Sequence, residues 1–169
     1  MDEIVRQAMT RWPDVPACHG WLRLDRRGQW HVPDGPLRHP GLVDFIQRNY
    51  SALPDGRWFF QNGPQRVFVD LDYTPLILRL DSSDQLHTHT GQAIHALTGA
   101  WLDEEGSLLL GWSGGAGLVD DRDLGQLADA LHETRHGWQL DWQGQLLMVT
   151  PIKKAEVPVH FGFVARPRD

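Results

Sequence analysis

A turn motif that recurs along the chain sets the strongest limit on its fold. The motif is leucine followed by Asp-x-x-Gly, and it occurs as Leu24-Asp25-x-x-Gly28, Leu102-Asp103-x-x-Gly106 and Leu140-Asp141-x-x-Gly144. Aspartate at the first turn position accepts a hydrogen bond from a backbone N–H two residues later, and glycine at the fourth position takes a positive φ without a Cβ clash. Each copy is therefore predicted to form the tip of a β-hairpin, with a type I turn closed by a G1 bulge.

Helices and strands are predicted around these turns. Apolar residues at helical spacing indicate helices over residues 2–12 and 40–50, and Asp120, Asp121 and Asp123 suit the start of a third helix. Apolar and aromatic runs indicate strands over residues 20–24, 29–32, 57–61, 65–71, 75–80, 99–103, 107–112, 138–141, 145–150 and 157–165. Two polar or glycine-rich segments are predicted to be loops, at residues 81–85 and 114–117.

The order hairpin, helix, hairpin occurs twice, which indicates an internal structural duplication. Gly28 and Gly106 are 78 residues apart, and Trp58 and Trp138 are 80 residues apart. We therefore predict an α+β fold, mainly of antiparallel β-hairpins with two or three short helices. Antiparallel proteins without a duplication also use such turns, which is the alternative. The expected organisation is one compact unit made of an N-terminal helix and linker (1–19), a first repeat (20–97) and a second repeat (98–169).

Composition and charge narrow the range of partners. The 169 residues carry a formal net charge of −6, which argues against nucleic acid or an anionic membrane as the main partner. The chain lacks an 18-residue apolar run and the basic start and apolar core of a signal peptide, so we expect no membrane span and a cytoplasmic location. Cys18 is the only cysteine, which excludes an internal disulfide and a cysteine-cluster metal site.

Residues 20–80 carry a further pattern, namely Asp25-Arg-Arg-Gly-Gln-Trp30, a helix opened by Pro40, Gly56-Arg-Trp-Phe and Arg66-Val-Phe-Val-Asp70. This order resembles an uncharacterised proteobacterial domain-of-unknown-function (DUF) family, in which a D-x-x-G-x-W hairpin, a P-x-L-V-x-x-F helix and an aromatic hairpin follow one another. The resemblance implies a duplicated α+β fold with hairpin–helix–hairpin repeats and a signalling or ligand-binding role. Its motifs are structural, so it assigns no functional residue.

Two histidines on one predicted strand form the first candidate site. The imidazoles of His87 and His89 are two residues apart, so on a strand they point to one face, and His95 lies close in sequence. Asp70 and Asp72 share a face of another predicted strand in the same way. Two histidines with one or two carboxylates suit Zn²⁺ or Fe²⁺ with open positions, so a divalent metal is the candidate cofactor. The alternatives are hydrogen bonding to a small anionic ligand, or an ordinary solvated strand face.

Residues 111–115, Gly-Trp-Ser-Gly-Gly, match the G-x-S-x-G nucleophile elbow of serine hydrolases. In that interpretation Ser113 is the nucleophile, and His132, His136 or His160 is the base. The context is unfavourable, because hairpins rather than alternating strands and helices precede the motif, and the next predicted helix starts several residues later. The alternative is a glycine-rich connection between a hairpin and a helix.

These observations give three hypotheses about function. The first is a non-enzymatic cytoplasmic module that binds an unknown small ligand or a protein, with His87, His89 and His95 as ligand-binding candidates. The second is a metal-dependent enzyme that uses His87 and His89 with Asp70 and Asp72, and the third is a serine hydrolase at Ser113. Most of the eight tryptophans lie on predicted strands or turns, where packing between hairpins is favoured over an aromatic ligand groove.

Overall fold

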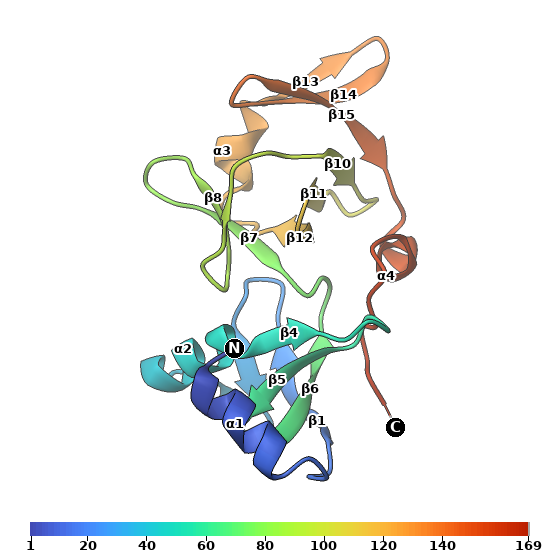
Figure 1. The fold of residues 1–169 in the computed structure, drawn as a ribbon. Coiled ribbons are helices and arrows are strands. Elements are labelled where there is room, and N and C mark those ends of the chain that lie inside the picture. Colours follow the sequence, from blue (N-terminus) through green and yellow to red (C-terminus); the bar gives the residue numbers. More distant parts are fainter. Residues whose placement is uncertain (169) are drawn as a thin grey trace. The chain divides into compact units, whose positions relative to one another are not determined.

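The computed structural model describes residues 1–168, which form two compact units (Figure 1). Unit 1 comprises residues Met1–Pro75 together with residues 162–168, and unit 2 comprises Leu76–Phe161. The fold class is α+β with mostly antiparallel strands, which confirms the prediction from the turn motifs.

Unit 1 contains a six-stranded sheet in the order β3-β2-β1-β6-β5-β4. Its elements are α1 (Glu3–Arg11), β1 (Cys18–Leu24), β2 (Trp30–Val32), β3 (Gly35–Pro36), α2 (Pro40–Arg48), β4 (Tyr50–Ala52), β5 (Trp58–Asn62) and β6 (Gln65–Leu71). The central strands β1 and β6 are parallel, and the other neighbours are antiparallel. Leu22, Leu24, Val69 and Leu71 of the central pair lie on one face of the sheet and are fully buried, so this face carries the core of the unit.

Unit 2 contains a nine-stranded sheet in the order β13-β14-β15-β10-β11-β12-β7-β8-β9. Its elements are β7 (Ile77–Leu80), β8 (Leu86–Thr88), β9 (Ala93–Ile94), β10 (Gly99–Leu102), β11 (Leu108–Trp112), β12 (Gly115–Val119), α3 (Leu124–Ala128), β13 (Leu131–Thr134), β14 (Gly137–Trp142), β15 (Gln145–Pro151), the 3-10 turn η1 (Lys154–Glu156) and α4 (Val157–His160). Leu108, Leu109 and Leu110 of β11 are all inaccessible to solvent, so the core of the unit lies on both faces of this strand.

The same order of elements occurs in both units. Motif A (residues 18–71) runs β1-β2-β3-α2-β4-β5-β6, and motif B (residues 99–151) runs β10-β11-β12-α3-β13-β14-β15. The strand orders are also the same, with a parallel central pair in each motif. The N–H of Asp72 donates to the carbonyl of Leu24 at 3.0 Å, and the N–H of Ile152 donates to the carbonyl of Leu102 at 3.1 Å. Topology and register together confirm the internal structural duplication.

Segments outside the two motifs differ from the division predicted from sequence. Strands β7, β8 and β9 were assigned to the first repeat, but β7 pairs in parallel with β12 and so extends the second sheet. Residues 162–168 were assigned to the second repeat, but they belong to unit 1, where the N–H of Leu71 donates to the carbonyl of Ala165 at 2.8 Å. Both placements are backbone pairings between segments far apart in sequence, which a local residue pattern does not encode.

Two predictions of local structure are wrong. Residues 157–165 were predicted to be a strand, but α4 occupies the start of this segment and η1 directly precedes it. Pro158 in the first turn of α4 explains the difference, because its fixed φ suits a helix start. Residues 114–117 were predicted to be a flexible loop, but residues from Gly115 onward belong to β12, where Gly117 packs against Leu76.

The predicted turn forms at two of the three motif copies. The Oδ1 atoms of Asp25 and Asp103 accept from the N–H groups two and four residues later, at 2.9 and 2.9 Å for Asp25 and at 2.9 and 2.7 Å for Asp103. Gly28 and Gly106 have positive φ angles of 74° and 80°. The copy at Asp141 also forms a hairpin, but its turn is of a different type. Residues 143 and 144 form a two-residue loop with φ angles of 47° and 81°, which is typical of a type I′ turn.

Candidate functional site

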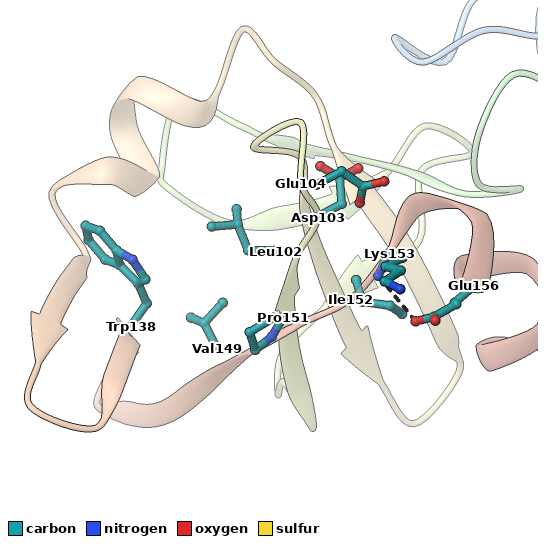
Figure 2. Close-up of a pocket in the computed structure, with 9 residues that line it drawn as sticks. All are labelled: Leu102, Asp103, Glu104, Trp138, Val149, Pro151, Ile152, Lys153 and Glu156. Atoms are coloured by element: carbon teal, nitrogen blue, oxygen red, sulfur yellow. Dashed lines mark hydrogen bonds between the residues drawn. The ribbon is translucent and has the colours of Figure 1, made fainter.

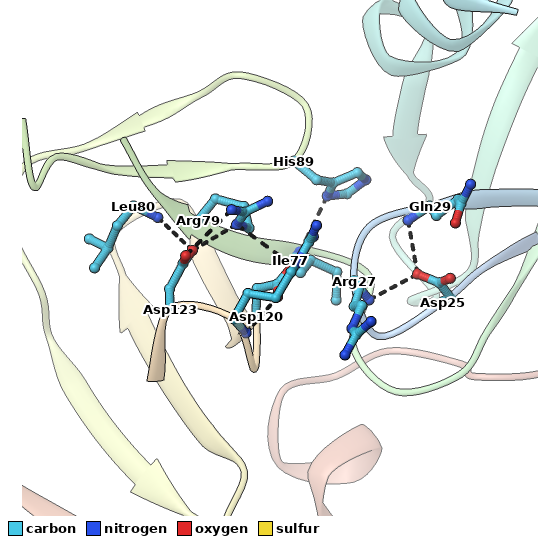
Figure 3. Close-up of polar contacts among 10 residues, drawn as sticks. Asp25, Arg27, Gln29, Ile77, Arg79, Leu80, His89, Asp120 and Asp123 are labelled. Atoms are coloured by element: carbon cyan, nitrogen blue, oxygen red, sulfur yellow. Dashed lines mark hydrogen bonds and ion pairs between the residues drawn. The ribbon is translucent and has the colours of Figure 1, made fainter. Parts of the chain in front are cut away.

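His87 and His89, which were predicted to share a site, both form hydrogen bonds within the hairpin made by β7 and β8. The Nε2 atom of His87 lies 2.9 Å from Oδ2 of Asp81, at the turn between β7 and β8. The Nδ1 atom of His89 accepts a hydrogen bond from the N–H of Ile77 at 3.2 Å (Figure 3). Burial lowers the pKa of His89 to about 3, so this imidazole is neutral at physiological pH. His95 is exposed on the loop after β9.

The pair formed by Asp81 and His87 repeats a pair in motif A. The Nε2 atom of His31 lies 2.8 Å from Oδ2 of Asp25, six residues away. Oδ1 of Asp81 accepts from the N–H groups two and four residues later, as Oδ1 of Asp25 does. Residues 81–84 are therefore a further copy of the turn, with Asp84 at a φ of 56° where the other copies have glycine. Both turns share the sequence pattern Asp-x5-His. The copy at residues 81–84 was missed because Asp84 stands where the other copies have glycine.

Asp70 and Asp72 belong to unit 1 and are paired with arginines there. Asp70 Oδ1 accepts from Arg168 at 2.8 Å, and Asp72 accepts from Arg23 and, at 3.4 Å, from Arg166. These ion pairs attach the C-terminal segment to the end of β6. Among residues 1–168, no group of three or more His, Cys, Asp and Glu side chains has the arrangement of a metal site. The predicted ligands therefore lie in two different units, and each one has a structural partner.

Ser113 lies in the two-residue loop of the hairpin formed by β11 and β12, where Trp112 pairs with Gly115. A nucleophile elbow requires a sharp turn from a strand into a helix. The chain instead turns from one antiparallel strand into the next, so the elbow interpretation of residues 111–115 is wrong. The match arose because a tight hairpin and an elbow both favour glycine.

The third helix begins where the aspartates predicted it, since α3 starts at Leu124 directly after Asp123, and the carboxylates of Asp120 and Asp123 also hold β7. Asp123 Oδ2 accepts from Nε of Arg79 at 2.7 Å and from the N–H of Leu80 at 2.9 Å (Figure 3). Asp120 is inaccessible to solvent and pairs with Arg122, whose pKa it raises through a hydrogen bond. These carboxylates are saturated by partners within unit 2, which argues for a structural role.

Unit 2 contains a cavity of about 440 Å³ between β10, β15 and the segment that leads into η1 (Figure 2). Leu102, Val149, Pro151 and Ile152 form its apolar wall, and the indole of Trp138 closes one side. Trp138 exposes 44 % of its surface, although the facing residues Val149 and Ile152 are buried. Its volume lies in the range of about 300–1,000 Å³ that is usual for small-molecule sites.

Motif A holds an aromatic cluster around the residue equivalent to Trp138. By register, Trp58 of motif A is equivalent to Trp138 of motif B. Trp58 packs on Tyr50 with ring centroids 4.8 Å apart, and Tyr50 packs on Trp30 with centroids 5.1 Å apart. The three rings form a continuous aromatic cluster in unit 1, and burial raises the pKa of Tyr50 well above its ordinary value.

Motif B has leucines at the positions of two of these rings. Leu24 pairs with Trp30 in motif A, and the equivalent Leu102 pairs with Leu108 in motif B. Leu131 likewise takes the position of Tyr50. A leucine stands in place of a ring at both positions, so within residues 1–168 the indole of Trp138 does not pack on an aromatic ring as Trp58 packs on Tyr50. The repeat therefore keeps the tryptophan but lacks the side chains that cover it.

The polar rim of the cavity carries an excess of negative charge. Asp103, Glu104 and Glu156 line it with one ammonium group, that of Lys153. Glu104 Oε2 accepts from the N–H of Lys154 at 2.8 Å, and Glu156 Oε2 accepts from the N–H of Lys153 at 3.4 Å (Figure 2). Among residues 1–168, neither the ammonium of Lys153 nor the carboxylates of Glu104 and Glu156 form a side-chain ion pair. Sequence reasoning missed this site, because its residues come from three separate segments.

Comparisons with known proteins place the chain among uncharacterised families. The model of the DUF2944 family, described as "Protein of unknown function (DUF2946)", matches residues 1–168. A DUF1285 family protein from Silicibacter pomeroyi DSS-3 is similar in structure, with a TM-score of 0.59 and 15% identity over 89% of this chain and 96% of that chain. A DUF1285 family protein from Shewanella baltica OS155 has a TM-score of 0.46 and 15% identity over 64% of this chain and 90% of that chain.

No curated protein shows significant similarity to the chain. At 15% identity, the Silicibacter structure supports the fold alone. Across residues 1–168, no helix is long and apolar enough to cross a membrane.

Proposed function

The chain belongs to the DUF2944 family, and we propose that it is a non-enzymatic module that binds a small amine with an apolar chain in the cavity of unit 2. The observation that carries this proposal is the exposed indole of Trp138 at an apolar cavity whose rim is net negative. The histidine candidates give less support for a binding site, because His87 and His89 already form hydrogen bonds within the hairpin of β7 and β8.

The apolar wall supplies the main attraction. A buried methylene group contributes about 0.8 kcal/mol, so an alkyl chain of about six carbons offers enough apolar surface for measurable affinity after the cost of association. Leu102, Val149 and Ile152 are held in place by the sheet, so the wall requires little reorganisation on binding.

The rim selects the charge of the ligand. Three carboxylates and one ammonium group repel an anionic head and attract a cationic one. An alkylammonium ion suits both the rim and the apolar wall, since its head can lie near Glu104 or Glu156 while its chain contacts Trp138.

The test is a titration of the full chain with hexylamine and, as the matched anion, hexanoate. The readout is the indole N–H signal of Trp138 in NMR spectra, identified as the signal that disappears in Trp138→Phe. We expect hexylamine to bind with a Kd of about 1 mM or lower, and at least about fivefold more tightly than hexanoate. Equal affinity for the two compounds, or no shift of the Trp138 signal, contradicts the proposal.

Variants of the site separate its two parts. Trp138→Ala is expected to abolish binding, and Glu104→Gln with Glu156→Gln to weaken hexylamine binding about threefold to tenfold, because exposed charges contribute modestly and glutamine keeps an acceptor oxygen. Asp44→Asn is the control, since it removes one negative charge from exposed α2 in unit 1. If Asp44→Asn weakens binding as much as the glutamine variants, the effect comes from net charge and not from the rim.

A further inference from the structure

Unit 1 contains a cavity at the tip of the hairpin formed by β5 and β6, and this cavity is smaller than the one beside Trp138 in unit 2. Its volume is about 270 Å³. Met9 and Trp12 at the end of α1 and Pro13 and Val15 in the following loop form an apolar wall. Gln65 fixes this loop to the hairpin by donating from Nε2 to the carbonyl of Pro16 at 3.4 Å. The cavity is therefore built from two segments that are tied together.

Gln61 presents an unsatisfied acceptor at this cavity. The residue is 1 % exposed and lines the cavity wall. Its Nε2 atom donates to the carbonyl of Gly63 at 3.0 Å, which fixes the orientation of the carboxamide. Its Oε1 atom is buried and has no hydrogen-bond partner among residues 1–168. A buried acceptor without a partner costs about 1–3 kcal/mol, so a retained one calls for an explanation.

Arg66 presents a donor directly opposite. Gln61 and Arg66 are cross-strand partners in register, so their side chains lie on the same face of the hairpin. The guanidinium carbon of Arg66 lies 4.6 Å from the ring centroid of Phe59, which holds the group in one plane. Its Nε atom is buried without a hydrogen-bond partner, and within residues 1–168 the side chain forms no ion pair.

We propose that this cavity binds a small carboxylate that carries a hydroxyl or N–H donor on the carbon next to the carboxyl group, together with a short branched apolar chain. The carboxylate pairs with Arg66, because a guanidinium group matches carboxylate geometry. The adjacent donor satisfies Oε1 of Gln61, and the apolar chain contacts Met9, Trp12 and Val15. None of the residues that line the cavity is acidic, which suits an anion. This site is independent of the amine site proposed for unit 2.

Three related compounds test the proposal on the full chain. The probe is 2-hydroxy-4-methylpentanoate, 4-methylpentanoate lacks the donor for Gln61, and the methyl ester of the hydroxy acid lacks the charge for Arg66. Binding is followed by NMR through the backbone amide signals of Gln61 and Arg66. We expect the hydroxy acid to bind about tenfold or more tightly than either analogue, because each analogue leaves one buried polar group unpaired.

Substitutions locate the binding. Gln61→Met is expected to remove the preference for the hydroxy acid over 4-methylpentanoate, and Arg66→Met to weaken binding of both acids by about tenfold or more. Arg38→Met, which removes an exposed arginine outside the cavity, is the control and should bind as the native chain does. Trp138→Ala should also leave this binding unchanged, which distinguishes it from the amine site.

Three results overturn the proposal. The first is equal affinity of the native chain for the hydroxy acid and 4-methylpentanoate, and the second is unchanged affinity in Arg66→Met. The third is absence of binding by all three compounds at about 10 mM, which means that ordered water alone satisfies Oε1 of Gln61. The comparison of the two acids on the native chain needs no variant, so the test holds even if Gln61→Met does not fold.

Discussion

Replacement of Gly56 by alanine is expected to destabilise unit 1 by about 3–5 kcal/mol. Gly56 has a φ of 84°, a conformation that costs an L-residue about 1–2 kcal/mol. A Cβ atom at this position would lie 2.4 Å from the carbonyl oxygen of Gly162 and 3.0 Å from Cα of Phe163. These are backbone atoms and cannot rotate away, so residues 162–164 have to move.

That movement has two further costs. The N–H of Val164 donates to the carbonyl of Gly56 at 3.0 Å, and loss of such a bond costs about 0.5–1.5 kcal/mol. Phe163 is 7 % exposed, and partial exposure of its ring costs about 1–2 kcal/mol more. Together with the backbone conformation, these contributions give the expected range.

The assay is native-state hydrogen exchange, because two units need not unfold together and a single unfolding midpoint would not report on one of them. The reporter is the amide of Leu71, which donates to the carbonyl of Ala165 in the displaced segment. The control is Gly20→Ala, since Gly20 has a similar φ of 69° but no heavy atom within 4 Å of a new Cβ. It should cost only about 1–2 kcal/mol. Equal loss of protection in Gly56→Ala and Gly20→Ala would refute the steric argument.

Three other outcomes follow from single contacts. Burial lowers the pKa of His89 to about 3 from its ordinary value of 6.5, so the stability of unit 2 should fall as the pH drops from 6.5 toward 3, and His89→Gln should weaken this pH dependence in the native-state exchange of unit 2 amides; the same pH dependence in both proteins contradicts this. Gln143→Asn should change the stability of unit 2 by less than about 0.5 kcal/mol, because asparagine tolerates the φ of 47° in this type I′ turn better than glutamine but loses the hydrogen bond from Nε2 of Gln143 to the carbonyl of Asp84 at 3.2 Å; a change of more than about threefold in the exchange of unit 2 amides contradicts this. Tyr50→Phe should destabilise unit 1 by about 1 kcal/mol through loss of the hydrogen bond from its hydroxyl to the carbonyl of Pro75, measured by exchange of unit 1 amides; unchanged exchange contradicts this.

The histidine motif shows how far local spacing can support a site. His87 and His89 were predicted to lie on one strand face, and β8 does contain the first of them. Spacing gives no information about hydrogen-bond partners, however, and here the partners are Asp81 and the N–H of Ile77. A residue type that is suited to metal binding is equally suited to closing a turn.

Both proposed sites depend on which residues pair across neighbouring strands, and no single sequence motif gives that pairing. On the face of the sheet that carries Trp138, Leu108 and Leu131 occupy positions that hold aromatic rings in motif A. This comparison requires strand registers, and registers come from the structure. Gln61 and Arg66 lie five residues apart in sequence, and only their pairing across the hairpin brings them to one face.

Local sequence was enough to predict the turns at Asp25 and Asp103, most of the strands, the first two helices and the duplicated order of elements. These features depend on interactions within a few residues, such as the carboxylate of Asp25 on nearby N–H groups and the positive φ of Gly28. Tertiary packing places β7 beside β12, returns the C-terminal segment to unit 1 and forms the two cavities proposed as sites. Those outcomes depend on side-chain volume and free strand edges that meet across long stretches of chain, which local periodicity does not specify.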